Sequence, residues 1–384
     1  MVEQTGPRTR LEQVLRQRHL TLTAAELSSP PAVAPLAMGT RGCERSDWEG
    51  QVIATSADRA RKFLIRIEAS NVGDETLDQL LDDVRRLVVA YQQQPLADLL
   101  PELVAVQDRA FGFLEGRQLP KQTRDLYPLA GVACGLMARA SHDLGAPHDA
   151  MTQARTAYAC ADNAGHDGLR AWTRGLQGLI TYRSGRLDDS LRYARLGSEA
   201  ATRSRGTAGV WLTSSEARSL AALGRLDEAG LAVARADEAR ERVQPDDLDG
   251  LGGVCTFGRP RQLYYAADAY AWGLDREAGT TERFAVEALE AYGDALDPER
   301  AFGAESGARC ALAIARVSRK EIDGALEALA PVLALPPQKR IYGVVTSVEH
   351  VRTALRAVTD PGRQVIELQG AIDTFTAERL ALPQ

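Results

Sequence analysis

The sequence predicts an all-α fold in which helical hairpins stack into an α-solenoid. Three glycines, Gly145, Gly185 and Gly224, lie 40 and 39 residues apart in similar hexapeptides. About fifteen residues of helical periodicity precede each glycine, and as many or more follow it. A fixed period of this size is typical of stacked-repeat architectures, which grow by adding units and need no central core.

Small residues flank each of these turns at constant positions, seven before the glycine and five after it. The pairs are Ala138 and Ala150, Gly178 and Ser190, and Ala217 and Ala229, with later copies at Ala266 and Ala278 around Gly273 and at Ala313 and Ala325 around Lys320. Small side chains there let two antiparallel helices approach closely. This skeleton resembles the tetratricopeptide repeat (TPR), although the spacing exceeds that motif's 34 residues and its early Trp and late Pro are missing.

The other hairpins are predicted from apolar periodicity. Residues 74–114 form a first hairpin, in which Pro95 opens the second helix. Three hairpins follow to about Val243. A glycine-rich loop at 244–260 then breaks the period, and loops of this length in compact arrays are usually functional or disordered. Two more hairpins and a final one at 346–378 give a TPR-like α-solenoid of about six to seven hairpins.

Residues 1–70 are predicted to be a small helical head, separate from the repeat domain at 74–384. Residues 9–19 have helical apolar spacing, whereas 22–42 contain three prolines and are predicted to be a loop or a damaged helix. Residues 1–66 carry ten Lys/Arg and seven Asp/Glu, a net charge of +3, so the remainder carries −9 of the chain's total of −6. An acidic body disfavours non-specific nucleic-acid binding, whereas a basic head permits it.

Composition argues against several classes of protein. Five scattered cysteines without a C-x-x-C argue against a disulfide framework or a zinc site and favour a reducing cytoplasm. No apolar run approaches 18 residues, and the N-terminus lacks the apolar core of a signal peptide, so we expect no membrane span. The five histidines show no metal-ligand spacing. His142 and His148 lie six residues apart on opposite sides of a turn and are expected at surface or capping positions. No nucleophile–base motif such as Gly-x-Ser-x-Gly occurs, so we expect no metal, no cofactor and no enzyme activity.

Several segments resemble actinobacterial transcriptional regulators in which an Xre-type helix-turn-helix precedes a C-terminal TPR region. The similar repeat segments are 252–257, 262–270, 299–303, 313–316 and 330–337. In the head, 11–21 is similar to the family's opening helix, and 48–50 (Trp-Glu-Gly) is similar to the Trp-Glu-x-Gly that ends its recognition helix, with one residue missing. Residues 28–40, however, have prolines where the family has a scaffold helix.

The resemblance implies a transcriptional regulator whose repeats sense a ligand and whose head binds DNA through Arg41 and Arg45. The alternative is a repeat adaptor that has lost DNA binding and acts through protein contacts alone. A compact helix-turn-helix with both arginines facing outward would favour the regulator.

Alignment on the turn glycines places aromatic and cationic side chains on the concave face. The set is Arg139, His142, Trp172, Tyr182, Arg183, Trp211, Ser214 and Arg218, with Tyr264 and Tyr265 at one end beside the glycine-rich loop. Guanidinium groups bind carboxylates in bidentate fashion and rings supply apolar area, so this groove suits a peptide or an anionic small molecule. Each tryptophan taken alone also fits the core between repeats. For Arg218 two outcomes are open: a guanidinium that faces solvent and binds a ligand in the groove, or an arginine that holds the repeats together. The expected partners are a peptide, small molecule or protein in the groove, DNA through the head, and a second copy of the chain.

Overall fold

The computed structural model describes the repeat region almost completely. The described residues are 52, 53, 55–57, 59, 60, 63, 70–295, 301–359 and 362–378. The chain divides into two units between residues 66 and 67, close to the expected boundary, and the second unit contains all of the repeats. The expected DNA-binding residues Arg41 and Arg45 lie outside the described residues.

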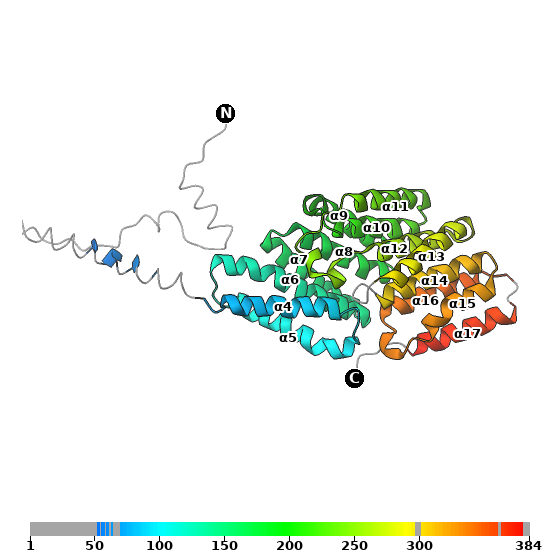
Figure 1. The fold of residues 1–384 in the computed structure, drawn as a ribbon, viewed down its shortest axis with the longest axis horizontal. Coiled ribbons are helices and arrows are strands. Elements are labelled where there is room, and N and C mark those ends of the chain that lie inside the picture. The colour runs from blue at the N-terminus through cyan, green and yellow to red at the C-terminus, as the bar shows by residue number, and fades with distance from the viewer. Residues whose placement is uncertain are drawn as a thin grey trace, which may run out of the picture. The chain divides into compact units, whose positions relative to one another are not determined.

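Fourteen α-helices, α4 to α17, form seven consecutive hairpins in the described part of the second unit (Figure 1). The pairs are α4 (Asp74–Ala90) with α5 (Leu96–Glu115), α6 (Pro120–Asp143) with α7 (Pro147–Ala164), α8 (Asp167–Arg183) with α9 (Leu187–Ser204), α10 (Ala208–Ala222) with α11 (Leu226–Glu241), α12 (Arg259–Tyr270) with α13 (Ala278–Asp294), α14 (Phe302–Ser318) with α15 (Ile322–Leu333), and α16 (Tyr342–Arg356) with α17 (Arg363–Ala377). The described residues contain no strand. The predicted all-α solenoid is therefore confirmed.

The repeated turns owe their shape to a left-handed residue after each first helix. Gly145, Gly185 and Gly224 have φ of 80°, 73° and 79°, and Lys320 takes the same place with φ of 63°. In each turn the following residue donates its N–H to a carbonyl five residues earlier. Glycine adopts this conformation without the steric penalty of a Cβ, which explains its recurrence at the predicted period.

The later turn that was expected around Gly273 is different. α12 continues into a 3₁₀ segment, η3 (Ala271–Arg276), within which Leu274 has φ of 44°. The left-handed residue is therefore Leu274, and Gly273 has no such conformation. The small residues on either side, Ala266 and Ala278, are nevertheless buried as the repeat pattern predicts.

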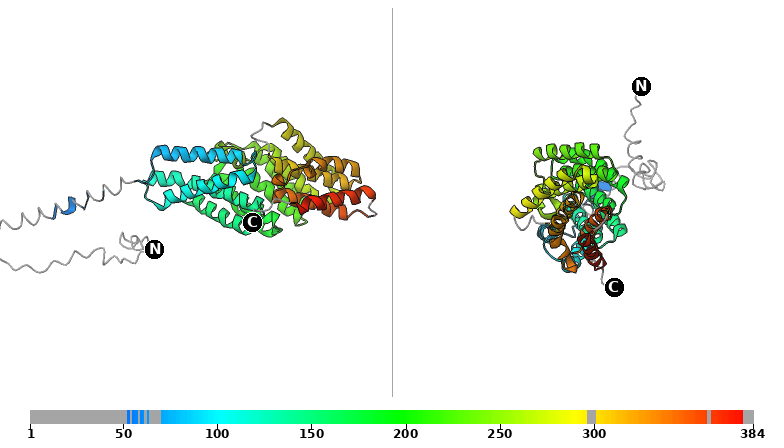
Figure 2. Two further views of the ribbon diagram at one scale, coloured as in Figure 1. Left: turned by 90° about the horizontal axis from the view of Figure 1, so that it is seen from below. Right: turned by 90° about the vertical axis from the view of Figure 1, so that its right-hand side faces the viewer.

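The first helices of successive hairpins stack on one another in the order α4, α6, α8, α10, α12, α14 and α16. In the left view of Figure 2, the blue helices at the start of the array and the red helix at its C-terminal end lie at opposite ends. α16 also contacts α6, so the last hairpin returns to the second. Side-chain contacts fix this closure: the Tyr342 ring packs edge-on against His142 of α6 at 5.6 Å, and Tyr342 Oη donates to the carbonyl of Arg183 at the end of α8 at 3.2 Å. The concave side of the array is consequently closed by its own C-terminal hairpin.

The glycine-rich loop between α11 and α12 packs inside the array. It contains two short 3₁₀ turns, η1 (Asp249–Leu251) and η2 (Gly253–Cys255), and the side chains of Val254 and Phe257 are fully buried. Trp172 Nε1 donates to the Val254 carbonyl at 3.2 Å, a bond that links α8 to the loop. The loop is therefore an ordered part of the core that covers the inner face of α8.

No described helix is both long and apolar enough to cross a membrane.

We expect Gly253→Ala to destabilise the repeat unit strongly. A Cβ at Gly253 would overlap the carbonyl oxygen of Val88 on α4, and the residue has φ of 49°. Overpacking against backbone together with left-handed strain should cost about 2 kcal/mol or more in the free energy of unfolding.

Gly250→Ala is the matched control, because no atom lies within 4 Å of a Cβ there. It should change the free energy of unfolding by less than about 0.5 kcal/mol. Urea denaturation measures both, and equal midpoints for the two variants would show that the loop does not pack on α4.

Candidate functional site

A chamber of ≈ 90 Å³ lies on the concave side of the array. It is enclosed by the ends of α6, α8, α10 and α12, the link between α4 and α5, the start of α14, and the segment that leads into α16. Gln94, Pro95 and Gln338 are exposed at its rim, whereas His142 and Trp211 are buried within it. One water needs about 10–15 Å³ on this measure, so the chamber has room for several waters or a small molecule.

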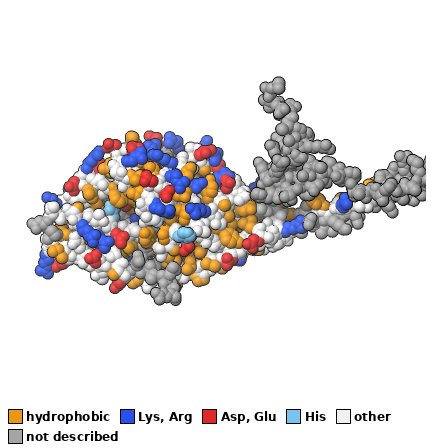
Figure 3. Space-filling view, turned by 180° about the vertical axis from the view of Figure 1, so that it is seen from behind, with side chains coloured by type: hydrophobic (Ala, Val, Ile, Leu, Met, Phe, Trp, Pro, Cys, Tyr) orange, Lys and Arg blue, Asp and Glu red, His pale blue; other side chains and the backbone are white. Residues whose placement is uncertain are grey.

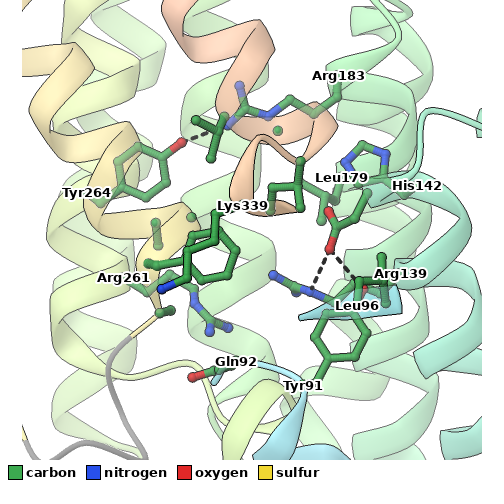
Figure 4. A pocket seen from close by; sticks show the side chains of 18 of the residues that line it. Tyr91, Gln92, Leu96, Arg139, His142, Leu179, Arg183, Arg261, Tyr264 and Lys339 are labelled. Atoms are coloured by element: carbon green, nitrogen blue, oxygen red, sulfur yellow. Dashed lines mark hydrogen bonds and ion pairs between the residues drawn. The ribbon is translucent and has the colours of Figure 1, made fainter. Parts of the chain in front are cut away.

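Cationic side chains dominate the chamber. Those that line it are Arg139, Arg183, Arg218, Arg261 and Lys339, and the lining contains one carboxylate, Asp143. Figure 4 shows Arg139, Arg183 and Arg261 entering the same space from different sides. On the outer face seen in Figure 3, by contrast, side chains of both charges are interspersed. Two larger surface grooves of ≈ 560 Å³ do not gather cations in this way, because one has Arg205 and Arg242 beside Glu216 and the other has four aspartates and a single lysine.

Arg218 forms a buried ion pair with Asp268 of α12. Its Nε lies 2.6 Å from Asp268 Oδ2, and the two side chains are only 3% and 7% exposed. The guanidinium lies between the rings of Tyr182 and Tyr265, at 4.2 and 4.1 Å from their centroids. Burial alone would raise the pKa of Asp268, but Arg218 and Arg183 hold that pKa below its ordinary value. Of the two outcomes left open for Arg218, the structure shows the arginine that holds the repeats together, because its charge is paired with a buried carboxylate on the neighbouring repeat.

Arg183 is held in place by neutral groups. Its Nη1 donates to Thr346 Oγ1 and to Ser347 Oγ, each at 3.1 Å, and its Nη2 donates to Tyr264 Oη at 2.7 Å. No carboxylate of the described residues lies within ion-pair distance of this guanidinium. The side chain is fixed between α8, α12 and α16 while its charge stays unpaired.

Arg139 and Arg261 are also poorly neutralised. Arg139 Nε lies 3.9 Å from Asp143 Oδ2, and that oxygen also accepts from Tyr91 Oη at 2.8 Å. Arg261 has no carboxylate within ion-pair distance in the described part of the chain, and its Nη1 makes a long contact of 3.4 Å with the Thr256 carbonyl. Burial, and then the charge of Arg139, lower the pKa of Arg261.

Buried polar atoms without a hydrogen-bond partner gather at this chamber. Five of its lining residues contribute one each: Gln92 Nε2, Arg139 Nε, His142 Nδ1, Arg183 Nε and Arg218 Nη2. A buried polar atom left unpaired costs about 1–3 kcal/mol, and more when the group is charged. This concentration at one place is typical of a site that binds a polar ligand.

His142 does not occupy the surface or capping position that was expected for it. The ring is buried, packs edge-on against Tyr342 at 5.6 Å, and lies at the chamber wall. Burial, with Arg183 and Arg139 adding to it, lowers the pKa of His142 to about 3. It is therefore neutral near pH 7. His166, by contrast, does cap α8, because its Nδ1 accepts from the N–H of Leu169 at 3.2 Å.

The structure divides the predicted groove residues into two groups. Seven of them line the chamber: Arg139, His142, Arg183, Trp211, Arg218, Tyr264 and Tyr265. Trp172, Tyr182 and Ser214 do not. Trp172 is 1% exposed and the loop at 244–258 covers it, Tyr182 Oη donates to Asp268, and Ser214 lines a separate small cavity beside α13.

The two tryptophans belong to the core between repeats. Their ring centroids are 6.5 Å apart, and Phe257 stacks on Trp211 at 6.2 Å. Tyr265 contacts the same Phe257 ring edge-on at 5.1 Å. Trp211 has a second role, because it also lines the chamber. The alternative to a groove position for each tryptophan was packing between repeats. Trp172 has this position alone, because it does not line the chamber.

Sequence reasoning missed several chamber residues. Arg261 precedes Tyr264 by three positions on one helix, so helical spacing alone could have included it. Gln92 and Lys339 gave no such signal, because they reach the chamber only through the closure of the array. The four described cysteines are free and buried, and no cluster of metal-ligating side chains occurs among the described residues.

None of the family models, curated proteins or solved structures compared with the chain matches it. The resemblance to Xre-type regulators therefore rests on the similar sequence segments alone.

We expect Arg218→Ala to lower the free energy of unfolding by about 3–5 kcal/mol, because it leaves Asp268 buried without its partner. The double variant Arg218→Ala/Asp268→Ala should lose clearly less than the sum of the two single losses. Chemical denaturation of all three gives the coupling energy. Arg225→Ala, which breaks an exposed pair with Glu228, is the control and should leave the midpoint nearly unchanged. Additive losses at Arg218 and Asp268 would show that the pair has no net coupling.

The buried neutral state of His142 should make stability depend on pH. The pKa of His142 is 6.5 in the unfolded chain and about 3 in the folded protein. Between these two pH values the unfolded chain binds a proton at this site that the folded protein does not. Stability therefore falls as pH decreases through this window. When the pH falls from 7 to 4.5, the free energy of unfolding of the wild type should decrease by roughly 2 kcal/mol more than that of His142→Gln. His148→Gln, at a side chain that is 96% exposed, should retain the wild-type slope. Identical slopes for wild type and His142→Gln would contradict the assignment.

Proposed function

We propose that the repeat unit is the ligand-binding sensor of a transcriptional regulator, and that its chamber binds a small organic anion. The observation that carries this proposal is the group of five buried or partly buried cations that face one chamber with a single carboxylate among them. Guanidinium groups are suited to buried carboxylate or phosphate groups, because their forked N–H donors match paired oxygens. Aromatic side chains around the charges supply apolar area for the rest of the ligand.

The shape of the concave side favours a small molecule over a peptide or a protein. The α11–α12 loop fills the inner face of α8, and α16 closes against α6. An extended peptide would need a continuous groove along the first helices, which these two segments interrupt. A small anion needs only the chamber itself.

The origin of the lining residues gives a physical route from binding to signalling. They come from the second to the last hairpins and from the link within the first, so one ligand contacts segments far apart in the chain. A ligand that contacts both α6 and α16 binds the closed array more tightly than an opened one. Binding therefore shifts the population toward closure, by as much as the two affinities differ.

The regulatory part of the proposal is supported by the resemblance of the head to Xre-type regulators and by its net charge of +3 over residues 1–66. A basic head on an acidic body is compatible with a DNA contact confined to the head. Loss of that contact would leave the repeat adaptor as the function.

A salt titration of the full chain on its own upstream DNA tests this function, with and without phenyl phosphate as an anionic probe. We expect DNA affinity to fall linearly with salt on logarithmic axes and to change when the probe is present. Arg183→Gln should keep DNA binding and lose the response to the probe, whereas Arg186→Gln, at a half-exposed surface arginine, should keep both.

Absence of DNA binding at every salt concentration would reject the regulator in favour of the adaptor. DNA binding that ignores the probe in wild type would reject the sensor.

A further inference from the structure

We propose that the charged end of the ligand is a phosphate monoester, a doubly charged tetrahedral group, which is held among Arg139, Arg183 and Arg261. This inference rests on the anion-binding function proposed above. The ligand class is therefore a small organic phosphate with an apolar or aromatic body. Charge, geometry and the surroundings of the three arginines each contribute to this assignment.

The first argument is charge balance. The described chamber and its immediate partners contain five cationic side chains and two carboxylates, Asp143 and Asp268, which leaves three positive charges unpaired. A carboxylate ligand would compensate one of them, and a phosphate dianion would compensate two. Unpaired charge is costly in a buried site of low dielectric, so the dianion is favoured.

The second argument is geometry. Arg139, Arg183 and Arg261 reach the chamber from α6, α8 and α12 respectively, and they enter from different sides (Figure 4). A planar carboxylate offers two oxygens in one plane and is saturated by one or two guanidinium groups. A phosphate monoester offers three terminal oxygens in a tetrahedral arrangement, which accept donors from several directions.

The third argument is that the donors are already positioned. Arg183 is fixed by three neutral oxygens, and its unpartnered Nε adds to the free donor atoms of Arg139 and Arg218 at the same chamber. His142 is neutral near pH 7 and contributes hydrogen-bonding capacity without further charge. Donors fixed before binding lose little conformational entropy when the anion arrives.

The body of the ligand would lie against the apolar wall. Trp211, Tyr264, Tyr265, Phe302 and Leu179 line the chamber next to the arginines. Rings of this kind pack well against a flat aromatic or apolar group. Trp211 at this wall also gives an intrinsic fluorescence signal for binding.

The experiment compares phenyl phosphate with benzenesulfonate, which has the same tetrahedral shape and ring but a single charge at every pH. Dissociation constants are measured with the full chain by tryptophan fluorescence and calorimetry, in buffers free of phosphate. At pH 7.5 we expect phenyl phosphate to bind at least about tenfold more tightly than benzenesulfonate, a difference in binding free energy of about 1.4 kcal/mol. At pH 5 this ratio should fall toward one, because the second pKa of a phosphate monoester is about 6.

The ratio of the two ligands removes the effect of the protein's own titration. The titratable groups around the three arginines include Tyr91 at the end of α4, His142 and Asp143 on α6, and Tyr264 on α12, and both probes encounter all of them equally.

Inorganic phosphate should compete with phenyl phosphate and bind more weakly, since it lacks the ring. Benzoate serves as the planar monoanion.

Two variants localise the phosphate. Arg261→Met and Arg183→Gln should each weaken phenyl phosphate binding by about tenfold or more, and weaken benzenesulfonate binding less. Arg186→Gln, at the surface, should change neither. Without any anion, Arg261→Met should melt no lower than wild type, because it removes a buried charge that has no carboxylate partner. A lower melting temperature with unchanged phosphate affinity would mean that Arg261 is structural, and would overturn the assignment.

The outcomes separate this inference from the function on which it rests. Equal binding of phenyl phosphate and benzenesulfonate, or tighter binding of benzoate, would reject the dianion and leave the anion sensor intact. Binding of none of these anions would reject both.

Discussion

The buried pair of Arg218 and Asp268 is the interaction on which the rest of the repeat unit depends. It joins α10 to α12 at the place where the α11–α12 loop interrupts the regular stacking. Tyr182 of α8 donates to the same carboxylate and receives a hydrogen bond from Trp272 Nε1 at 3.0 Å. One charge pair thus connects three first helices across the break in the repeat. Neither partner can be removed alone without leaving an isolated charge in the core.

The same constraint explains how cations remain unpaired nearby. Asp268 is committed to Arg218 and Tyr182, and Asp143 is shared between Tyr91 and Arg139. The carboxylate in the chamber lining and the one beside it are therefore occupied by structural partners, and Arg183 and Arg261 keep their charge for another group. Such an arrangement lowers the stability of the free protein and is typical of sites where binding is favoured over stability.

Closure of the array determines what the site can accept. In an open superhelix the inner faces of the first helices form a continuous groove that suits an extended peptide. Here the interior loop covers Trp172, and Tyr342 and Ser347 of α16 contact Arg183. The concave face is thereby reduced from a groove to a chamber, and the preferred ligand changes from a chain segment to a small anion.

The sequence by itself determined the hairpins, their turns and most of the residues that face inward. Gly145, Gly185 and Gly224 mark turns because glycine alone enters the left-handed conformation without steric cost, and this local property can be read without any tertiary context. Arg139, Arg183 and Arg218 could be placed on the inner face because helical periodicity fixes which side of a helix a residue occupies. Tertiary structure alone decided which of them would be paired. Asp268 lies 50 residues from Arg218, and Thr346 lies 163 residues from Arg183. Such contacts depend on how the hairpins curve and close, and this curvature sums small rotations over the whole stack that no single repeat reveals.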